Sequence, residues 1–336
     1  MPTVMLTTRC PNRCPWCFAR SKMEWYRSKG ILEMSWEAFL QVVDFHEASG
    51  VKQMKLLGGD PLLHSRILDI LDLLQSKNFS VQFFTSAVIP ASLVDRIREK
   101  QYAALQFGVN STLYFQYGAS RRAKVDYFLQ NIGYATGISY TLHNADLTEG
   151  APLFILDRLA MIRKFGLNRH LSLQVAVPSE GNAEYIPFDR YRQLFRRLRG
   201  YFDILGRHGI TYGIDCHCVP LCMIRETPDM GLSLRTSCQS FPIDIGPDLS
   251  VWPCFPLSEL TVGLDRFRNL SETQAYFSQE SRRKELCFDE SCEECPERED
   301  NRCSGGCLGF QPLRRARKQS PPRLQDDLRT GTVLAF

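Results

Sequence analysis

Three cysteines near the amino terminus form a compact group whose spacing suits metal chemistry. Cys10, Cys14 and Cys17 lie in the run CPNRCPWC, a C-x3-C-x2-C pattern within eight residues. Such a loop supplies three thiolates and no fourth, so a [4Fe–4S] cluster bound there would keep one iron free to bind a small molecule. The alternative is a zinc site that takes its fourth ligand from elsewhere in the chain.

A second motif, Gly58-Gly59-Asp60-Pro61, follows the apolar run 52–57. Two adjacent glycines let the backbone approach a ligand closely and leave its amides and carbonyls free. Alone, this motif would pass for an ordinary turn. One expected strand downstream of a C-x3-C-x2-C loop, it favours an iron–sulfur site over zinc.

Together these motifs resemble those of the radical S-adenosylmethionine (radical SAM) enzymes. Trp16 precedes the third cysteine, where that family has an aromatic residue, and Asp60 stands where glutamate is usual. The resemblance covers residues 1–209 and implies that the three cysteines hold a [4Fe–4S] cluster whose open iron is chelated by S-adenosylmethionine. Reductive cleavage of that cofactor would give a 5′-deoxyadenosyl radical, which abstracts hydrogen from a substrate.

The same resemblance implies further cofactor contacts. The segment Gly58, Gly59, Asp60 and Pro61 would hold the amino group of the methionine part, and Trp16 would lie near the adenine. Polar residues at the ends of the third and fourth expected strands would bind the ribose; they are Thr85, Ser86 and Asn110. For Trp16 and these three residues, the alternative is an ordinary structural role as a core aromatic or a strand-end polar side chain.

Ten of the thirteen cysteines lie between residues 210 and 312. Their pattern resembles the SPASM or twitch extension, which carries auxiliary clusters in many radical SAM enzymes. The segment 245–254 (IGPDLSVWPC) carries this resemblance, together with a C-x2-C pair followed by a C-x3-C pair. The chain departs from the family in the longer gap between these pairs and in having no cysteine after Cys307.

This second resemblance implies one or two auxiliary [4Fe–4S] clusters. The first would be bound by Cys222, Cys238, Cys254 and Cys307. The second would be bound by Cys292, Cys295 and Cys303, with Cys287 or a non-cysteine ligand in place of the missing terminal cysteine. Zinc is the alternative for these late cysteines, because four thiolates suit either metal.

Charged residues around the late cysteines are a less specific indication of function than the cysteine and glycine motifs. Asp244 and Asp248 lie beside the expected auxiliary cluster, where some relatives place a proton acceptor, and they are the candidate catalytic residues. Eight acidic residues between positions 285 and 300 would lower the reduction potential of a cluster and repel nucleic acid. A solvated surface explains these acidic residues equally well.

Alternating strands and helices must position these motifs. Strands are expected at 2–7, 52–57, 80–86, 104–109, 137–142 and 171–178, with helical periodicity between them. Such alternation is typical of an α/β fold with a parallel sheet, in which ligands collect at the carboxyl ends of the strands. The resemblance specifies a partial (β/α)6 radical SAM barrel at 1–209, followed by a small, irregular cysteine-rich domain at 210–312. Residues 313–336 form a basic tail that we expect to be flexible.

The composition and the lengths of the apolar runs argue against several classes of protein. A net charge of +4 on 336 residues argues against nucleic acid as a partner. No apolar run approaches the roughly 20 residues that span a bilayer, and no signal peptide is evident. We therefore expect a cytoplasmic protein with no membrane partner. In a reducing compartment, an odd number of clustered cysteines indicates metal binding rather than disulfides.

The sequence leaves the substrate open. Auxiliary-cluster radical SAM enzymes frequently oxidise, epimerise or crosslink peptide or protein side chains, which is the first hypothesis. Against it, the chain begins almost at its cysteine loop and leaves no room for a leader-peptide domain. The second hypothesis is a dehydrogenase or carbon-skeleton enzyme acting on a small molecule, and the third is a non-catalytic metal- or nucleic-acid-binding module. Either enzyme would need a low-potential electron donor such as flavodoxin or ferredoxin.

Overall fold

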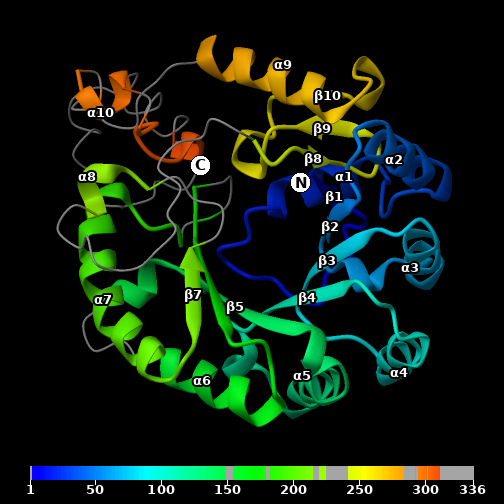
Figure 1. Cartoon of the computed structure of the whole chain (residues 1–336), viewed down its shortest axis with the longest axis horizontal. Coiled ribbons are helices and arrows are strands. Elements are labelled where there is room, and N and C mark those ends of the chain that lie inside the picture. Colours follow the sequence, from blue (N-terminus) through cyan, green and yellow to red (C-terminus); the bar gives the residue numbers. More distant parts are fainter. Residues whose placement is uncertain are drawn as a thin grey trace.

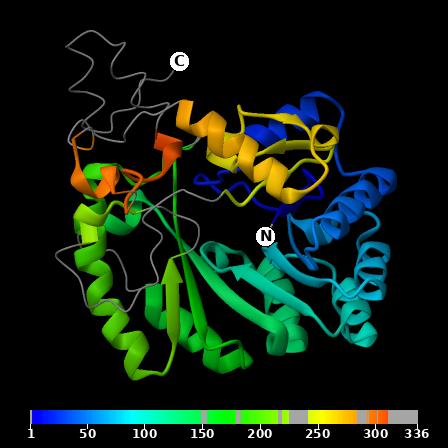
Figure 2. The ribbon, with the colours of Figure 1, turned by 45° about the horizontal axis from the view of Figure 1, so that its top comes forward.

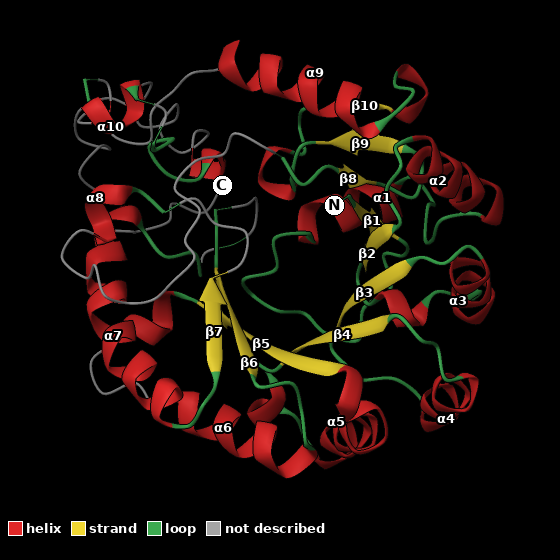
Figure 3. Ribbon diagram, viewed as in Figure 1, coloured by secondary structure: helices red, strands yellow, loops and turns green. Residues whose placement is uncertain are grey.

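A computed structural model describes the chain at residues 2–148, 154–178, 182, 184–214, 219–224, 241–283, 292, 294–300 and 302–310. Its strands form one ten-stranded sheet in the order β10-β9-β8-β1-β2-β3-β4-β5-β6-β7. The sheet curves around an interior, and most of the helices lie along its outer side (Figure 1 and Figure 3). The predicted tail at 313–336 lies outside the described residues.

The first seven strands run parallel to one another and form the curved wall. All six strands expected from the sequence are present. The strands are β1 (Thr3–Met5), β2 (Gln53–Leu57), β3 (Ser80–Thr85), β4 (Leu105–Asn110), β5 (Thr136–Leu142), β6 (His170–Val175) and β7 (Thr211–Ile214). An open parallel sheet of this kind confirms the expected α/β fold and is consistent with a partial barrel.

The helices connect these strands, and Ser35 illustrates how the sequence starts one of them. Its side chain accepts a hydrogen bond from the amide of Ala38 (3.1 Å) and so caps the helix that begins at Trp36. The helices are α1 (Arg20–Ser28), α2 (Trp36–Ala48), α3 (Ile67–Ser76), α4 (Ala91–Lys100), α5 (Ala119–Ile132), α6 (Phe154–Phe165) and α7 (Tyr191–Arg207).

Helix α7 buries one apolar stripe. Its buried positions are Tyr191, Leu194, Phe195, Leu198, Tyr201, Phe202 and Leu205. Burial of each such side chain stabilises the fold by about 1.5–3 kcal/mol. Packing against the sheet therefore fixes α7.

The inner face of the sheet differs in character from the outer face. Along β6, Leu171, Leu173 and Val175 are buried, whereas the alternating Ser172 and Gln174 are only half-buried. In the neighbouring strand, the hydroxyl of Thr141 donates to Gln174 Oε1 (3.3 Å). Because successive side chains of a strand point to opposite faces, the barrel interior has a polar, uncharged lining at these strands.

The sheet continues beyond residue 209, where the sequence predicts a domain boundary. β7 pairs with β6, and β8 (Asp244–Ile245) pairs in parallel with β1 at the other edge. β9 (Ser250–Trp252) and β10 (Val262–Gly263) follow in antiparallel order. The sequence analysis missed these strands, because two to four residues are too few to show a period.

Three further helices are α8 (Leu221–Ile224), α9 (Leu270–Arg283) and α10 (Pro296–Glu299). Within the described ranges, no helix has the length and apolar character that crossing a membrane requires.

Candidate functional site

The three cysteines of the first motif lie on the loop that joins the carboxyl end of β1 to α1. The amide of Cys17 donates to the carbonyl of Cys14 (3.2 Å) and turns the loop back on itself. The amide of Asn12 donates to the sulfur of Cys10 (3.4 Å). All three cysteines are half-buried. The loop therefore presents three sulfurs at the edge of the sheet where ligands collect.

Burial dominates the electrostatics of this loop. It raises the pKa of Cys10 to about 11, that of Cys14 to about 12, and that of Cys17 as well. The guanidinium groups of Arg20 and Arg27 on α1 act in the opposite direction, and each also donates a hydrogen bond to a backbone carbonyl of the loop. A cluster bound here must displace the thiol protons, and the two cations offset part of its negative charge.

The glycines of the second motif bring the end of β2 against the cysteine loop. The amide of Gly59 donates to Thr7 O and that of Asp60 to Arg9 O, both at 2.7 Å. A Cβ at Gly58 would lie 2.4 Å from Thr7 O, and one at Gly59 would lie 2.1 Å from Arg9 O. Only glycine fits such an approach. The expectation that these amides are free for a ligand is wrong, because they hold the loop; the carbonyls are what this segment can offer.

The carboxylate of Asp60 is fully buried and holds the neighbouring strand end. It accepts hydrogen bonds from Thr85 Oγ1 (2.8 Å), from Ser86 Oγ (2.6 Å) and from the Ser86 amide (2.9 Å). Burial raises its pKa, and these hydrogen bonds oppose that rise. Pro61 begins the short 3-10 helix η1 (Pro61–Leu63), whose amide at Leu62 also donates to Asp60 (3.3 Å). The hydroxyls of Thr85 and Ser86, expected near a ribose, thus point to Asp60.

Trp16 and Asn110 lie at the same end of the sheet. The buried Trp16 stacks on His143, which directly follows β5, with ring centroids 4.4 Å apart and planes 4° from parallel. The Nδ1 atom of His143 is buried and has no hydrogen-bond partner among the described residues. Asn110 ends β4 and donates to Thr141 Oγ1 of β5 (3.0 Å). The cysteine loop therefore contacts the end of β5 through Trp16, and β5 in turn is bonded to the end of β4.

Two contacts of the cysteine loop could not be found from the sequence. The hydroxyl of Tyr117 accepts a hydrogen bond from Asn12 Nδ2 (2.7 Å), and burial raises the pKa of Tyr117 to about 12. The other amide atom, Asn12 Oδ1, is buried and lacks a donor in the described part of the chain. Tyr117 and His143 belong to no motif, so no local signal identifies them. The three thiols suit a [4Fe–4S] cluster, and the unpaired acceptor beside them suits a small molecule with hydrogen-bond donors, such as an amine or a hydroxyl.

The two candidate catalytic carboxylates lie apart from this arrangement. Asp244 on β8 pairs with Thr3, at the amino end of β1, whereas the cysteine loop leaves the carboxyl end. Burial raises its pKa to about 7. Asp248 is exposed in the turn before β9, where it accepts hydrogen bonds from the Tyr26 hydroxyl (2.9 Å) and the Ser250 amide (3.0 Å).

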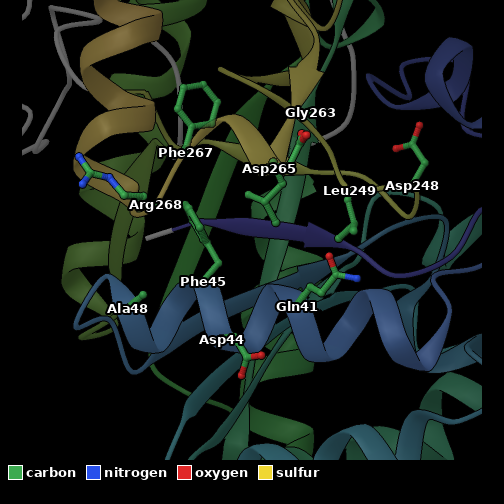
Figure 4. A pocket seen from close by; sticks show the side chains of 11 residues that line it. Gln41, Asp44, Phe45, Ala48, Asp248, Leu249, Gly263, Asp265, Phe267 and Arg268 are labelled. Atoms are coloured by element: carbon green, nitrogen blue, oxygen red, sulfur yellow. The ribbon is translucent and has the colours of Figure 1, made fainter.

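A separate pocket of about 490 Å³ lies between α2 and the β9–β10 region. Figure 4 shows the side chains of α2 on one side and those around Phe267 on the other. Its charged lining residues are Asp44, Asp248, Asp265 and Arg268. Of the predicted site residues, Asp248 alone lines it, so this pocket is distinct from the cysteine loop.

Six of the eight late cysteines with a predicted ligand role are described; Cys238 and Cys287 lie outside the described residues. Cys254 directly precedes the 3-10 helix η6 (Phe255–Leu257), and Cys307 directly precedes η9 (Leu308–Phe310). The two 3-10 helices pack together, so these two cysteines lie on neighbouring segments, as one shared centre would require.

The environment of Cys222 includes two other late cysteines. After burial, the largest influence on the Cys222 thiol is that of Cys303, and Cys295 acts in the same direction; all three effects raise its pKa. In the part of the chain that the structure describes, no three His, Cys, Asp or Glu side chains are arranged to hold one metal ion.

Part of the sequence matches a known protein family, and the fold resembles that of solved structures. Residues 4–145 match the family model of the Radical SAM superfamily. The search of curated proteins gave no match. The solved structures of similar fold include SuiB of Streptococcus suis bound to S-adenosylmethionine, with 14% identity and a TM-score of 0.64 over 92% of this chain and 72% of that one. Native anSMEcpe with bound AdoMet gives 14% identity and 0.61 over 98% and 99%. The matched residues 4–145 contain both motifs of the site, and at 14% identity the two solved structures show a shared fold.

Proposed function

We propose that this chain is a radical SAM enzyme that cleaves S-adenosylmethionine reductively and abstracts hydrogen from a peptide or protein side chain. The observation that carries the proposal is the backbone pairing of Gly59 and Asp60 with the cysteine loop. This pairing fixes three thiols and a glycine segment side by side at the carboxyl edge of a parallel sheet. A lone zinc knuckle has no need of such an arrangement.

The residues of the site have separate tasks in this proposal. Cys10, Cys14 and Cys17 bind the [4Fe–4S] cluster, which supplies an open iron and one electron for cleavage of the cofactor. The carbonyls around Gly58 and Gly59 accept hydrogen bonds from the methionine amino group. Trp16 packs against the adenine, and the end of β4 at Asn110 faces the ribose. Asp60 keeps β3 and β2 in register beneath the cofactor.

Thr85 and Ser86 act mainly through Asp60. Their hydroxyls already donate to its carboxylate, so their contribution to the ribose contact is indirect. One or two auxiliary [4Fe–4S] clusters on the late cysteines would accept the electron that substrate oxidation releases. A flavodoxin or ferredoxin would supply the first electron.

Two observations favour a peptide substrate. The barrel interior carries uncharged polar side chains such as Ser172 and Gln174, which can pair with the amide groups of a peptide backbone. anSMEcpe has been solved with AdoMet and the Cp18Cys peptide, and it resembles this chain with a TM-score of 0.57 and 14% identity over 98% of this chain and 94% of that one. The alternative is a small molecule oxidised or rearranged in cofactor or natural-product synthesis.

The first experiment tests the cluster. We would purify the wild type and a Cys10/Cys14/Cys17→Ala variant without oxygen and measure iron, sulfide, zinc and, with dithionite, 5′-deoxyadenosine. We expect about 8–12 irons in the wild type, a loss of about 4 in the variant, and cofactor cleavage in the wild type alone. Zinc in place of iron, with no difference between the two proteins, would point to a non-catalytic metal-binding module.

The second experiment tests the substrate class. Extract from cells grown on deuterated amino acids is separated into a peptide and a small-molecule fraction, and each is incubated with enzyme, S-adenosylmethionine and dithionite. We expect deuterium in 5′-deoxyadenosine from the peptide fraction, and its loss when that fraction is first digested to free amino acids. Deuterium from the small-molecule fraction alone would favour the alternative substrate.

A further inference from the structure

Tyr117 is held on the loop between β4 and α5, at the carboxyl end of the sheet. It directly follows the short 3-10 helix η2 (Tyr114–Gln116), and its amide donates to the carbonyl of Tyr114 (3.2 Å). The guanidinium of Arg122 on α5 donates to the carbonyls of Phe115 (3.0 Å) and Tyr117 (3.3 Å). The side chain of Tyr117 is buried. These contacts fix the backbone of Tyr117 without any bound group.

Asn12 connects the Tyr117 hydroxyl to the cysteine loop. This residue lies midway between Cys10 and Cys14. Its backbone amide donates to the sulfur of Cys10 (3.4 Å), and its side-chain Nδ2 donates to the hydroxyl of Tyr117 (2.7 Å). The first residues of the chain, in dark blue, run inside the curve of the sheet in Figure 1 and Figure 2. A single residue therefore links the buried hydroxyl to a sulfur of the first motif.

The Tyr117 hydroxyl has a proton that no described residue accepts. A phenol hydroxyl can accept one hydrogen bond and donate another, and the bond from Asn12 uses its oxygen as the acceptor. Burial raises the pKa of Tyr117 to about 12, so the hydroxyl keeps its proton at neutral pH. Cys10 and Cys14 both lie close enough to influence it. A cluster bound to these cysteines would place sulfur atoms, which accept hydrogen bonds, on this side of the loop.

We infer that the Tyr117 hydroxyl donates a hydrogen bond to a sulfur of the first [4Fe–4S] cluster and thereby raises the reduction potential of that cluster. The inference rests on the proposed function, which assigns the cluster to Cys10, Cys14 and Cys17. The reduced cluster carries one more negative charge than the oxidised cluster, so a hydrogen-bond donor stabilises the reduced form more. Asn12 is a positioning residue, because it orients the hydroxyl. The hydrogen bond makes the first electron, on which cofactor cleavage depends, easier to deliver.

The test is a redox titration of the wild type and of Tyr117→Phe, which keeps the ring and removes only the hydroxyl. The full-length proteins are purified without oxygen, and their iron is counted. They are then titrated without S-adenosylmethionine while the paramagnetic resonance signal of the reduced cluster is followed, and signals that remain in Cys10/Cys14/Cys17→Ala are subtracted. We expect full iron in Tyr117→Phe and a reduction equilibrium about tenfold less favourable, which for one electron lowers the potential by about 59 mV.

Two further variants separate this role from a general effect of removing a polar group. Tyr127→Phe on α5 removes a hydroxyl that donates to Asp95 of α4 (2.7 Å), and it should leave the potential unchanged. Asn12→Ala should lower the potential by less than Tyr117→Phe does, and it should add nothing in the double variant, because Asn12 acts through Tyr117. An unchanged potential in iron-loaded Tyr117→Phe, or an equal shift in Tyr127→Phe, would overturn the inference. Additive shifts in the double variant would contradict the role of Asn12.

Replacement of Tyr117 by a ring-fluorinated tyrosine gives a second measurement that keeps the hydroxyl and makes it a stronger donor. The potential of the first cluster should then rise above that of the wild type. An unchanged or lower potential would overturn the inference, including the case in which Tyr117→Phe loses its cluster. The iron count distinguishes this failure from that of the proposed function. Zinc in place of iron in the wild type would refute both, whereas an iron-loaded protein whose potential ignores position 117 would refute the hydrogen bond alone.

Discussion

The first and the late cysteine groups contrast in what holds them. Cys10, Cys14 and Cys17 lie on a loop pinned by backbone hydrogen bonds to β2 and by two arginines of α1. The described late cysteines lie on or beside single helical turns, such as α8, α10, η6 and η9. Turns this short have little stability of their own. We therefore expect the sheet to build the first site before metal binds, and we expect the proposed late metal site to depend on metal to hold its parts together.

The largest expected effect follows from adding one methyl group to the first site. A Cβ in Gly59→Ala would lie 2.1 Å from Arg9 O and 2.9 Å from Cys10 Cβ. Since the nearest atom is backbone, the cysteine loop must leave β2. We expect loss of about four irons and of cofactor cleavage, together with about 1–3 kcal/mol of stability. The late cysteines should keep their metal.

The matched control for this variant is Gly200→Ala in α7. No atom lies within 4 Å of a Cβ there, and alanine favours a helix interior over glycine by about 0.5–1 kcal/mol. Iron content and thermal unfolding should show a normal or slightly more stable protein. A normal iron content in Gly59→Ala would show that the cysteine loop binds its cluster without the contact to β2. The proposed difference between the first and the late cysteine groups would then be wrong.

The second prediction concerns Asp244, where the late segment joins the sheet. Its folded pKa of about 7 lies above the ordinary 3.8, so the fold favours the protonated form. The free energy of unfolding therefore falls as pH rises from about 4 to about 7 and is constant above. Asp244→Asn removes the ionisable carboxyl group, so the stability of the variant should not fall over this pH range. Because a tenfold change in proton affinity is worth about 1.4 kcal/mol, the variant should gain up to about 4 kcal/mol at pH 8.

Denaturant unfolding of wild type and Asp244→Asn between pH 5 and 8 measures this gain. Asp69→Asn on the exposed face of α3, whose partner is Arg66, should change stability by less than about 1 kcal/mol at every pH. A constant difference between wild type and Asp244→Asn would mean that the buried carboxyl does not titrate in this range.

The regions around the two cysteine groups also differ in how much of their structure could be predicted from the sequence. The long, periodic elements of the barrel were predicted, because α7 and β2 to β6 repeat their apolar residues over enough turns to be seen. β8 and β10 have two residues each, which no period can reveal. The cysteine and glycine motifs identified two segments that the structure brings together. Its closure by Tyr117 and His143 could not be predicted, since those contacts join residues about a hundred positions apart.

The third prediction changes the late group alone. A Cβ in Gly309→Ala would lie 2.5 Å from Pro256 Cβ and 3.4 Å from the Cys307 sulfur. The obstacle is a ring carbon of proline, which moves only with the backbone of η6. Because η6 and η9 are single 3-10 turns, we expect them to separate more easily than the cysteine loop can leave β2, at a cost near 1–2 kcal/mol. We expect partial loss of metal from the late cysteines and unchanged cofactor cleavage. Iron counts in the Cys10/Cys14/Cys17→Ala background measure the metal lost from the late cysteines. A normal iron count would show that η9 does not support a metal centre there.

The smallest expected effect separates stacking from hydrogen bonding at Trp16. His143→Ala removes the ring that lies 4.4 Å from Trp16, and such a pair is worth about 0.5–1.5 kcal/mol. If Trp16 orients the cofactor, the affinity for S-adenosylmethionine should fall about 2–10-fold. His143→Phe keeps a flat ring on Trp16 and should retain wild-type affinity. Equilibrium dialysis of the iron-loaded proteins measures both.

The two variants together decide what the buried Nδ1 of His143 does. Equal loss in the Phe and Ala variants would assign the effect to the ring nitrogen, which has no hydrogen-bond partner among the described residues and lies 3.8 Å from the carboxylate of Glu184. Wild-type affinity in both would show that Trp16 needs no support from β5. In that case the loop, its glycine contacts and α1 would be sufficient for the first site, and the sheet beyond β2 would serve the substrate rather than the cofactor.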